Sequence, residues 1–312
     1  ENQRPQPVRH WFQFRLRNLL ALIAIASAVL GWFVFELDQR QGEKQAIAWV
    51  EEMSGAVGFE FKGSVGAQLD YKPVRFIEVS WWDKFKDNLF GRRVVSVNLS
   101  GSAVSDLSPL ADLKNLHLLN LHQAEVSDLT PLAGLKHLKE LDLSEASDLD
   151  DLAPLGNLKR LNRLVLSCSA VSDLRPLAGL RNLEDLELWD TRVSDLSPLA
   201  ALEKLDFLHL GNVVKVHDLN PLADLKRLNW LVLYNTQVSD LTPLAGLINL
   251  ERLDVNGTRV RELSPLAGLE KLDELDVVGA EIKVEDLAPM AKIKKLRSLS
   301  LSMTEGRDVS PL

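Results

Sequence analysis

Prolines recur at a nearly constant interval over the last two-thirds of this 312-residue chain. Ten of its thirteen prolines belong to the series, 22 to 24 residues apart: Pro109, Pro131, Pro154, Pro176, Pro198, Pro221, Pro243, Pro265, Pro289 and Pro311. A fixed period of this size indicates a solenoid, in which each unit buries its apolar face against its neighbours. We therefore expect the function to lie on the surface that the stacked repeats present, rather than in one catalytic pocket.

The unit from Val104 to Leu121 contains two periodicities. Its first leucines are three residues apart, which predicts a short 3₁₀-like turn with one apolar edge. Leu119 and Leu121 then alternate with polar Asn120, which is the pattern of a short strand. One strand per repeat predicts ten parallel strands, side by side on the inner face of an arc.

Each turn carries two candidate capping groups. Ser108 before Pro109 predicts a helix start, with the serine hydroxyl as the cap and proline at the first position. An acidic residue also lies three positions before every repeat proline, as Asp106 does before Pro109. A ladder of acids suggests cation binding. The stronger interpretation is that each carboxylate accepts hydrogen bonds from the backbone amides that follow it.

The motif V-S-D-L-T-P-L-A-G-L-K-H-L-K-E-L-D-L, from Val126 to Leu143, resembles the leucine-rich-repeat family, in its internalin-like class with 22-residue units. The resemblance covers Val94 to the end of the chain. It implies an α/β solenoid with a ten-strand parallel concave sheet and short 3₁₀ or helical convex turns. The asparagine usual in the family after each strand is missing. Small or hydroxyl residues such as Ser169 and Thr191 must fill that turn instead.

Charge and cysteine content exclude several function classes. The chain has 36 basic and 44 acidic residues, a net charge of −8, and the whole excess lies in the repeats. A negative repeat surface argues against nucleic acid as a partner, because nucleic acid requires a basic footprint. The single cysteine, Cys168, excludes an internal disulfide and a cysteine-based metal site, and its place in a turn favours a structural role over a reactive thiol.

The N-terminal part of the chain differs in kind from the repeats. An uninterrupted apolar run covers residues 19–35, follows four arginines, and has Trp11 and Trp32 near its ends. A helix of that length reaches about 26 Å, close to the thickness of a bilayer core. We predict a single transmembrane signal anchor there. A cleaved signal peptide and a buried core helix are the alternatives, and Ala26-Ser27-Ala28 has the form of a cleavage site.

The excess of arginine before the apolar run predicts the orientation of the chain. The positive-inside tendency places residues 1–18 in the cytoplasm and the repeats in the periplasm or outside the cell, on a single-pass inner (cell) membrane protein. Residues 36–93 would be a linker and an N-terminal cap for the repeat domain, residues 94–312. The Trp81-Trp82 pair fits the core of that cap better than a binding feature.

Aromatic residues gather on the concave face of three consecutive repeats. In each strand the leucines point into the core, so the residues between them face the concave side. The predicted partner-binding patch consists of Trp189, Phe207, His209, Trp230, Val232 and Tyr234. Exposed tryptophan and tyrosine are typical of binding hot spots. The alternative is cross-strand packing, because neighbouring aromatic side chains stabilise a sheet without any ligand.

Charged residues surround the predicted patch and would form its rim: Arg163, Asp185, Glu187, Arg252 and Asp254. No phosphate-binding glycine loop, nucleophile motif or paired metal-ligand motif occurs in the sequence, so we expect no enzyme activity, no cofactor and no metal. His122 and His209 both face the concave side, but four repeats separate them.

These features together predict a membrane-anchored, non-enzymatic module that recognises another protein outside the cytoplasm. Two alternatives stay open. Stacked aromatic rings near carboxylates also suit a glycan or cell-wall polysaccharide, and a solenoid can serve as a purely structural envelope protein.

Overall fold

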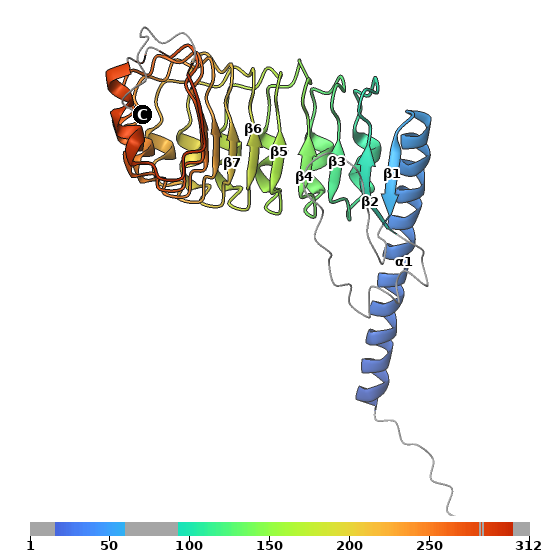
Figure 1. Cartoon of the computed structure of the whole chain (residues 1–312). Helices are drawn as coiled ribbons and strands as arrows, with labels where there is room; N and C mark the ends of the chain where they lie inside the picture. Colours follow the sequence, from blue (N-terminus) through green and yellow to red (C-terminus); the bar gives the residue numbers. More distant parts are fainter. Residues whose placement is uncertain (1–15, 60–92, 281, 283, 302–312) are drawn as a thin grey trace, which may run out of the picture.

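Ten parallel strands form one face of the molecule, and they run in sequence order (Figure 1). The computed structural model describes residues 16–59, 93–280, 282 and 284–301. The strands are β2 (Val94–Asn98), β3 (Leu118–Asn120), β4 (Glu140–Asp142), β5 (Arg163–Val165), β6 (Asp185–Glu187), β7 (Phe207–His209), β8 (Trp230–Val232), β9 (Arg252–Asp254), β10 (Glu274–Asp276) and β11 (Ser298–Ser300). The predicted ten-strand parallel sheet is confirmed, although the unit around Pro311 lies outside the described residues.

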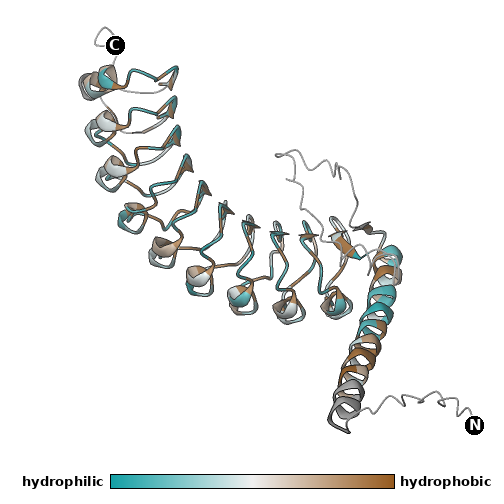
Figure 2. Ribbon diagram, turned by 90° about the horizontal axis from the view of Figure 1, so that it is seen from below, coloured by the Kyte–Doolittle hydropathy of each residue, from teal (hydrophilic) through white to brown (hydrophobic). Residues whose placement is uncertain are grey.

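Short 3₁₀ helices form the opposite face. They are η1 (Ser108–Asp112), η2 (Thr130–Gly134), η3 (Ala153–Asn157), η4 (Arg175–Gly179), η5 (Ser197–Ala201), η6 (Asn220–Leu222), η7 (Thr242–Gly246), η8 (Ser264–Gly268) and η9 (Val284–Lys292). Figure 2 shows the strands along the inner edge of the arc and these turns along its outer edge. The predicted arc with 3₁₀ convex turns is therefore confirmed.

Leucines from strands and turns meet between the two faces. In the repeat that contains β7, Leu199, Leu202, Leu205, Leu208 and Leu210 are all 0% exposed. Neighbouring repeats place leucine or valine at the same positions, so one continuous core runs along the arc. Each repeat fills the space beside the next, which is why the apolar period is kept so strictly.

The acid before each turn, rather than the serine, is the capping group. Asp106 Oδ1 accepts a hydrogen bond from the backbone N–H of Ser108 at 2.8 Å. The same bond recurs from repeat to repeat, as at Asp195 with Ser197 and Asp240 with Thr242. The prediction of a Ser108 hydroxyl cap is wrong, because Ser108 is already the first residue of η1 and makes no side-chain cap bond. The prediction of carboxylates that bond the following amides is confirmed for the seven aspartates from Asp106 to Asp240.

In the turn after the strand, hydroxyl side chains make hydrogen bonds in place of the missing asparagine. The hydroxyls of Ser169, Thr191 and Thr236 each donate to the carbonyl oxygen three residues earlier, at 2.6 to 2.8 Å. The residue just before each hydroxyl, such as Asp190 or Asn235, has a positive φ. This left-handed residue turns the chain out of the sheet, and the hydroxyl supplies a donor to a carbonyl oxygen inside the turn.

A long helix covers the first repeat. Helix α1 (Leu16–Glu52) runs without a break across the predicted boundary between anchor and linker, and β1 (Ala56–Phe59) follows it. Strand β1 pairs antiparallel with β2, which adds an eleventh strand that the repeat pattern does not predict. Ala46 and Val50 of α1 are buried in the core, and this half of the helix closes the open edge of the solenoid.

Charged residues also join α1 to the first repeat. Glu36, Arg40 and Glu43 are buried at the junction. Glu43 accepts hydrogen bonds from Arg40 at 2.9 Å and from the backbone N–H of Val94 at 2.6 Å. Arg93 pairs with Glu36. Buried charges are tolerated when they are paired, so this seam fixes the position of the helix against β2.

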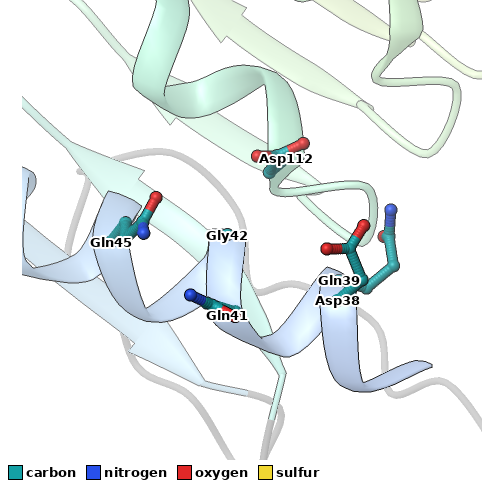
Figure 3. A pocket seen from close by; sticks show the side chains of 6 residues that line it. All are labelled: Asp38, Gln39, Gln41, Gly42, Gln45 and Asp112. Carbon is teal, nitrogen blue, oxygen red and sulfur yellow. The ribbon is translucent and has the colours of Figure 1, made fainter. Parts of the chain in front are cut away.

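A glycine lets α1 approach the first turn closely. A side chain at Gly42 would lie 2.5 Å from a carboxylate oxygen of Asp112 in η1. The gap beside this contact is a polar hollow of about 220 Å³, lined by five residues of α1 and by Asp112 (Figure 3). Its lining is made of amides and carboxylates at a packing seam, so we attribute it to the junction of the two elements.

The N-terminal half of α1 projects beyond the repeats (Figure 1). Among the residues that the structure describes, no helix is long and apolar enough to cross a membrane. The transmembrane helix predicted over residues 19–35 is therefore not confirmed. The Trp81-Trp82 pair, assigned above to the cap, lies outside the described residues.

Candidate functional site

The parallel register places the predicted patch in rows across the concave face. One row runs from Phe207 on β7 to Trp230 on β8 and Arg252 on β9. The next row runs through Glu187, His209 and Val232. Each row consists of residues at the same position of successive repeats. Side chains far apart in the sequence are therefore one strand spacing apart, about 4.8 Å.

Four rings form a connected cluster, which we call the aromatic cluster: Phe207, His209, Trp230 and Tyr234. The centroids of Phe207 and Trp230 are 4.8 Å apart, with a 44° tilt. The His209 ring lies edge-on to Phe207 at 6.2 Å and to Tyr234 at 5.6 Å. The Arg252 guanidinium lies over the Trp230 ring, 5.1 Å from its centroid. All four rings are partly exposed, so they form a shaped surface and not a sealed core.

Two predicted members of the patch do not join this cluster. Val232 is only 4% exposed, so it offers a partner almost no surface. Trp189, one strand before the cluster, is partly exposed and makes no ring contact with it. Its Nε1–H is buried and has no acceptor within the described part of the chain. The patch is therefore smaller than the sequence predicts.

Gly211, which the sequence analysis did not include in the predicted patch, shapes the aromatic cluster. Gly211 occupies the position that holds Trp189 and Tyr234 in the neighbouring repeats. A methyl group there would lie 2.4 Å from the Tyr234 ring and 2.9 Å from the His209 ring. The absence of a side chain at Gly211 thus lets Tyr234 lean across the strand toward His209. The signal in the sequence is a glycine at a position where most repeats carry a side chain.

The predicted rim residues lie around the cluster and are already paired in part. Arg163 lies 2.7 Å from Glu187 and 3.9 Å from Asp185. Arg252 lies 3.3 Å from Glu274, which the sequence prediction left out of the rim. Asp254 accepts a hydrogen bond from the backbone N–H of Asn256 at 2.9 Å. The arginines therefore serve as links within the sheet as well as surface charges.

Burial changes the protonation of several concave side chains. Burial raises the pKa of the Glu187 and Asp254 carboxyls above their usual range, since it removes water from the charged form. The same effect lowers the pKa of His209. His209 Nδ1 accepts the N–H of Gly211 at 3.3 Å, which places the proton of the neutral ring on Nε2. The histidine at the centre of the cluster is therefore neutral at pH 7.

His209 and Cys168 were the side chains to check for acid–base, metal or thiol chemistry. His209 has aromatic neighbours and a backbone partner, and no carboxylate orients it. Within the described ranges, no group of three or more His, Cys, Asp or Glu residues is arranged to hold a metal ion. Cys168 lies at a left-handed turn position, and burial raises the pKa of its thiol, so the reactive thiolate is disfavoured at neutral pH.

The fold is shared with internalins and with plant receptors. An internalin (InlF) from Listeria monocytogenes is 30% identical, with a TM-score of 0.60 over 68% of this chain and 69% of that one. Internalin C2 from the same organism is 34% identical, with a TM-score of 0.57 over 60% of this chain and 80% of that one. The plant peptide hormone receptor RGFR1, solved in complex with RGF2, is 17% identical (TM-score 0.53, 63% of this chain, 34% of that one) and shares the fold alone.

No protein-family model matches the chain, and no curated protein matches its sequence significantly. The similar solved structures are internalins and a plant peptide hormone receptor. The first of them combines the same repeat class with 30% identity over more than two-thirds of both chains. This chain belongs to the internalin family of leucine-rich-repeat proteins.

Proposed function

We propose that this chain recognises another protein through its concave face, with the aromatic cluster as the centre of the contact. The observation that carries the proposal is the cluster itself: partly exposed rings, held in place by one another and by Arg252. Rigid aromatic side chains beside arginine lose little conformational freedom on binding and dominate protein interfaces. Elsewhere on this face the residues are mainly small, amide or charged.

The ring geometry favours a protein over a glycan. A sugar stacks on the open face of an aromatic ring. Along the row of Trp230, Phe207 lies on one side of the ring and the Arg252 guanidinium on the other. Trp230 therefore has a neighbour on each adjacent strand, and the tilted rings present an uneven surface to a partner. Such a surface suits side chains that interlock with it.

The test compares the full chain with its Trp230→Ala variant as bait for proteins extracted from the cell envelope and from the surrounding medium. A partner retained by the wild type and lost with Trp230→Ala supports the proposal, and Ser300→Ala, at a distant strand, is the matched control. Equal capture by all three baits argues against the concave site. In parallel, binding of a glycan array that depends on Trp230 would favour the polysaccharide alternative.

We also propose that the chain is held at the cell membrane by residues 19–35, with the repeats on the periplasmic or extracellular side. Support comes from the four arginines before the apolar run and from exposed apolar side chains on α1, such as Ile25, Leu30 and Phe35. Protease added to intact spheroplasts should digest the repeats and leave a membrane-bound fragment. Protected repeats would argue against this orientation, and recovery in the soluble fraction would argue against attachment.

A further inference from the structure

The aromatic cluster lies between two groups of carboxylates. From β4 to β10, the concave positions carry seven acids and two arginines. The acids are Glu140, Asp142, Asp185, Glu187, Asp254, Glu274 and Asp276, and the arginines are Arg163 and Arg252. His209 adds no charge at neutral pH because burial lowers its pKa. A partner that covers the rings must therefore also cover a surface of negative charge.

Both arginines are already neutralised within the sheet. Arg163 pairs with Glu187 and Asp185, and Arg252 pairs with Glu274. The remaining four acids form no ion pair in the part of the chain that the structure describes: Glu140 and Asp142 on β4, and Asp254 and Asp276 on β9 and β10. The two pairs lie on opposite sides of the cluster, which occupies β7 and β8.

One acid of each pair has lost part of its hydration. Burial raises the pKa of Glu140, and at Asp254 burial and the neighbouring charge of Asp276 raise the pKa as well. Water that has already been removed makes a carboxylate a stronger site for a cation, because the Coulomb attraction is less screened. An apolar or acidic partner would bury these charges further without compensation, which is costly.

We propose that the partner docks a segment in which an apolar side chain covers the aromatic cluster and basic side chains reach the carboxylates on both flanks. The proposal rests on the proposed function of the concave face. One lysine or arginine would meet Asp254 and Asp276, and a second would meet Glu140 and Asp142. The arginine stacked on Trp230 supplies the local precedent for guanidinium groups at this surface.

The register of the sheet predicts the spacing of the two basic residues. Five strand spacings separate β4 from β9, which is about 24 Å. An extended chain covers about 3.3 Å per residue, so a segment that runs along the arc would carry its basic residues about seven positions apart. The apolar residue would lie between them, nearer to the basic residue that meets β9.

The experiment selects binders from a random 12-residue peptide library displayed on phage, with the immobilised full chain as target. Peptides that bind wild type but not Trp230→Ala are synthesised with a fluorescent label, and their Kd is measured by anisotropy. The first comparison is Asp254→Asn/Asp276→Asn, whose amides keep the shape and the hydrogen-bond acceptor. The second is Glu140→Gln/Asp142→Asn. The control is Glu203→Gln/Glu270→Gln, which removes two exposed charges away from the strands.

Support requires that the selected peptides carry an apolar residue between two Lys or Arg residues. Each concave double variant should then weaken binding about tenfold, while the control changes Kd less than twofold and added salt weakens wild-type binding. If the control variant loses as much affinity as the concave variants, the effect is one of net charge, and the proposal is wrong. If the concave variants lose no affinity, the proposal is also wrong. Neither outcome would contradict the proposed function, which is binding at the concave face. If every selected peptide binds Trp230→Ala as well as wild type, the proposed function fails.

Discussion

Two pairs of repeats, those of β2 and β3 and those of β7 and β8, have the same backbone structure but different concave side chains. Both pairs bury a leucine or valine at the centre of each strand, and both begin their turns with a bonded aspartate, Asp106 in one case and Asp218 in the other. Their concave positions differ. The first pair carries serine, asparagine, leucine and histidine, whereas the second carries the aromatic cluster.

This difference shows which positions are constrained by folding. A core position must fit the repeats on both sides of it, so its residue type is nearly fixed along the arc. A concave position meets solvent, and the fold tolerates serine and tryptophan there equally. We therefore expect function at the concave positions, where the residue type varies without a requirement from the fold. The following experiments test whether the residues needed for folding and those needed for binding are different.

The largest expected effect is on the core beneath the cluster. Leu208→Ala should lower the free energy of unfolding by about 2–5 kcal/mol, because it leaves a cavity in a fully buried site. Urea denaturation monitored by circular dichroism measures it. Leu119→Ala in β3 is the matched control and should cost a similar amount. A much smaller loss at Leu208 would mean that the core is not continuous along the arc.

The second effect separates binding from stability. Trp230→Ala should weaken binding of a partner recovered with the wild type by at least about 2 kcal/mol, or thirtyfold, as truncation of a central interface aromatic does. Stability should fall by only about 1 kcal/mol, the worth of one ring contact and one cation–π contact. Calorimetric titration and urea melts measure the two quantities. A large loss of stability with unchanged affinity would make the cluster a packing feature.

The third effect tests whether the shape of the cluster matters. Gly211→Ala should push the Tyr234 ring away from His209, because the added methyl would lie 2.4 Å from the ring. The ring can rotate, so we expect stability to change by less than about 1 kcal/mol, with about a tenfold loss of affinity. Side-chain NMR shifts of His209 and Tyr234 report the displacement. Unchanged shifts with wild-type affinity would exclude a shaping role for Gly211.

The smallest effect lies on the turn edge, which all repeats share. Hydrogen bonds from Ser197 lower the pKa of Asp195 below its usual value. Its contribution to stability is therefore complete above the unfolded pKa of about 3.9 and is lost as the pH falls through the lower folded pKa. Asp195→Ala should lower Tm slightly at pH 7 and converge with wild type in acid. Calcium should change neither Tm, and a calcium-dependent gain would revive the cation-binding interpretation.

The sequence predicts the repeat architecture, but it does not predict the specific contacts within and between repeats. The proline period and the leucine spacing predict the arc, the parallel strands and the 3₁₀ turns, because each is set by residues a few positions apart. The same reasoning proposed both the Ser108 hydroxyl and the Asp106 carboxylate as caps, and it could not decide between them. Both residue types cap helices well, and only the start of η1 at Ser108 distinguishes them.

The contacts made by the residues before β2 were also beyond prediction from the sequence. The helical spacing of Ala46, Val50 and Met53 indicates a helix just before β1. No local pattern shows that this helix is continuous with the apolar run, that β1 pairs antiparallel with β2, or that Glu43 bonds the backbone of Val94. These contacts join segments about 40 to 50 residues apart. Nothing local in the sequence records a long-range pairing that the described repeats do not share.

The concave site was likewise predicted in part from the sequence and in part only seen in the structure. The sequence by itself determined the fold class and the strand positions, and with them the rows in which Phe207, Trp230 and Arg252 become neighbours, since the repeat period fixes the register. Only the tertiary structure decided that Val232 is buried, that Trp189 lies outside the aromatic cluster, and that Gly211 makes room for Tyr234. The physical reason is that register depends on backbone hydrogen bonds that every repeat shares, whereas ring contacts depend on the particular side chains of adjacent repeats.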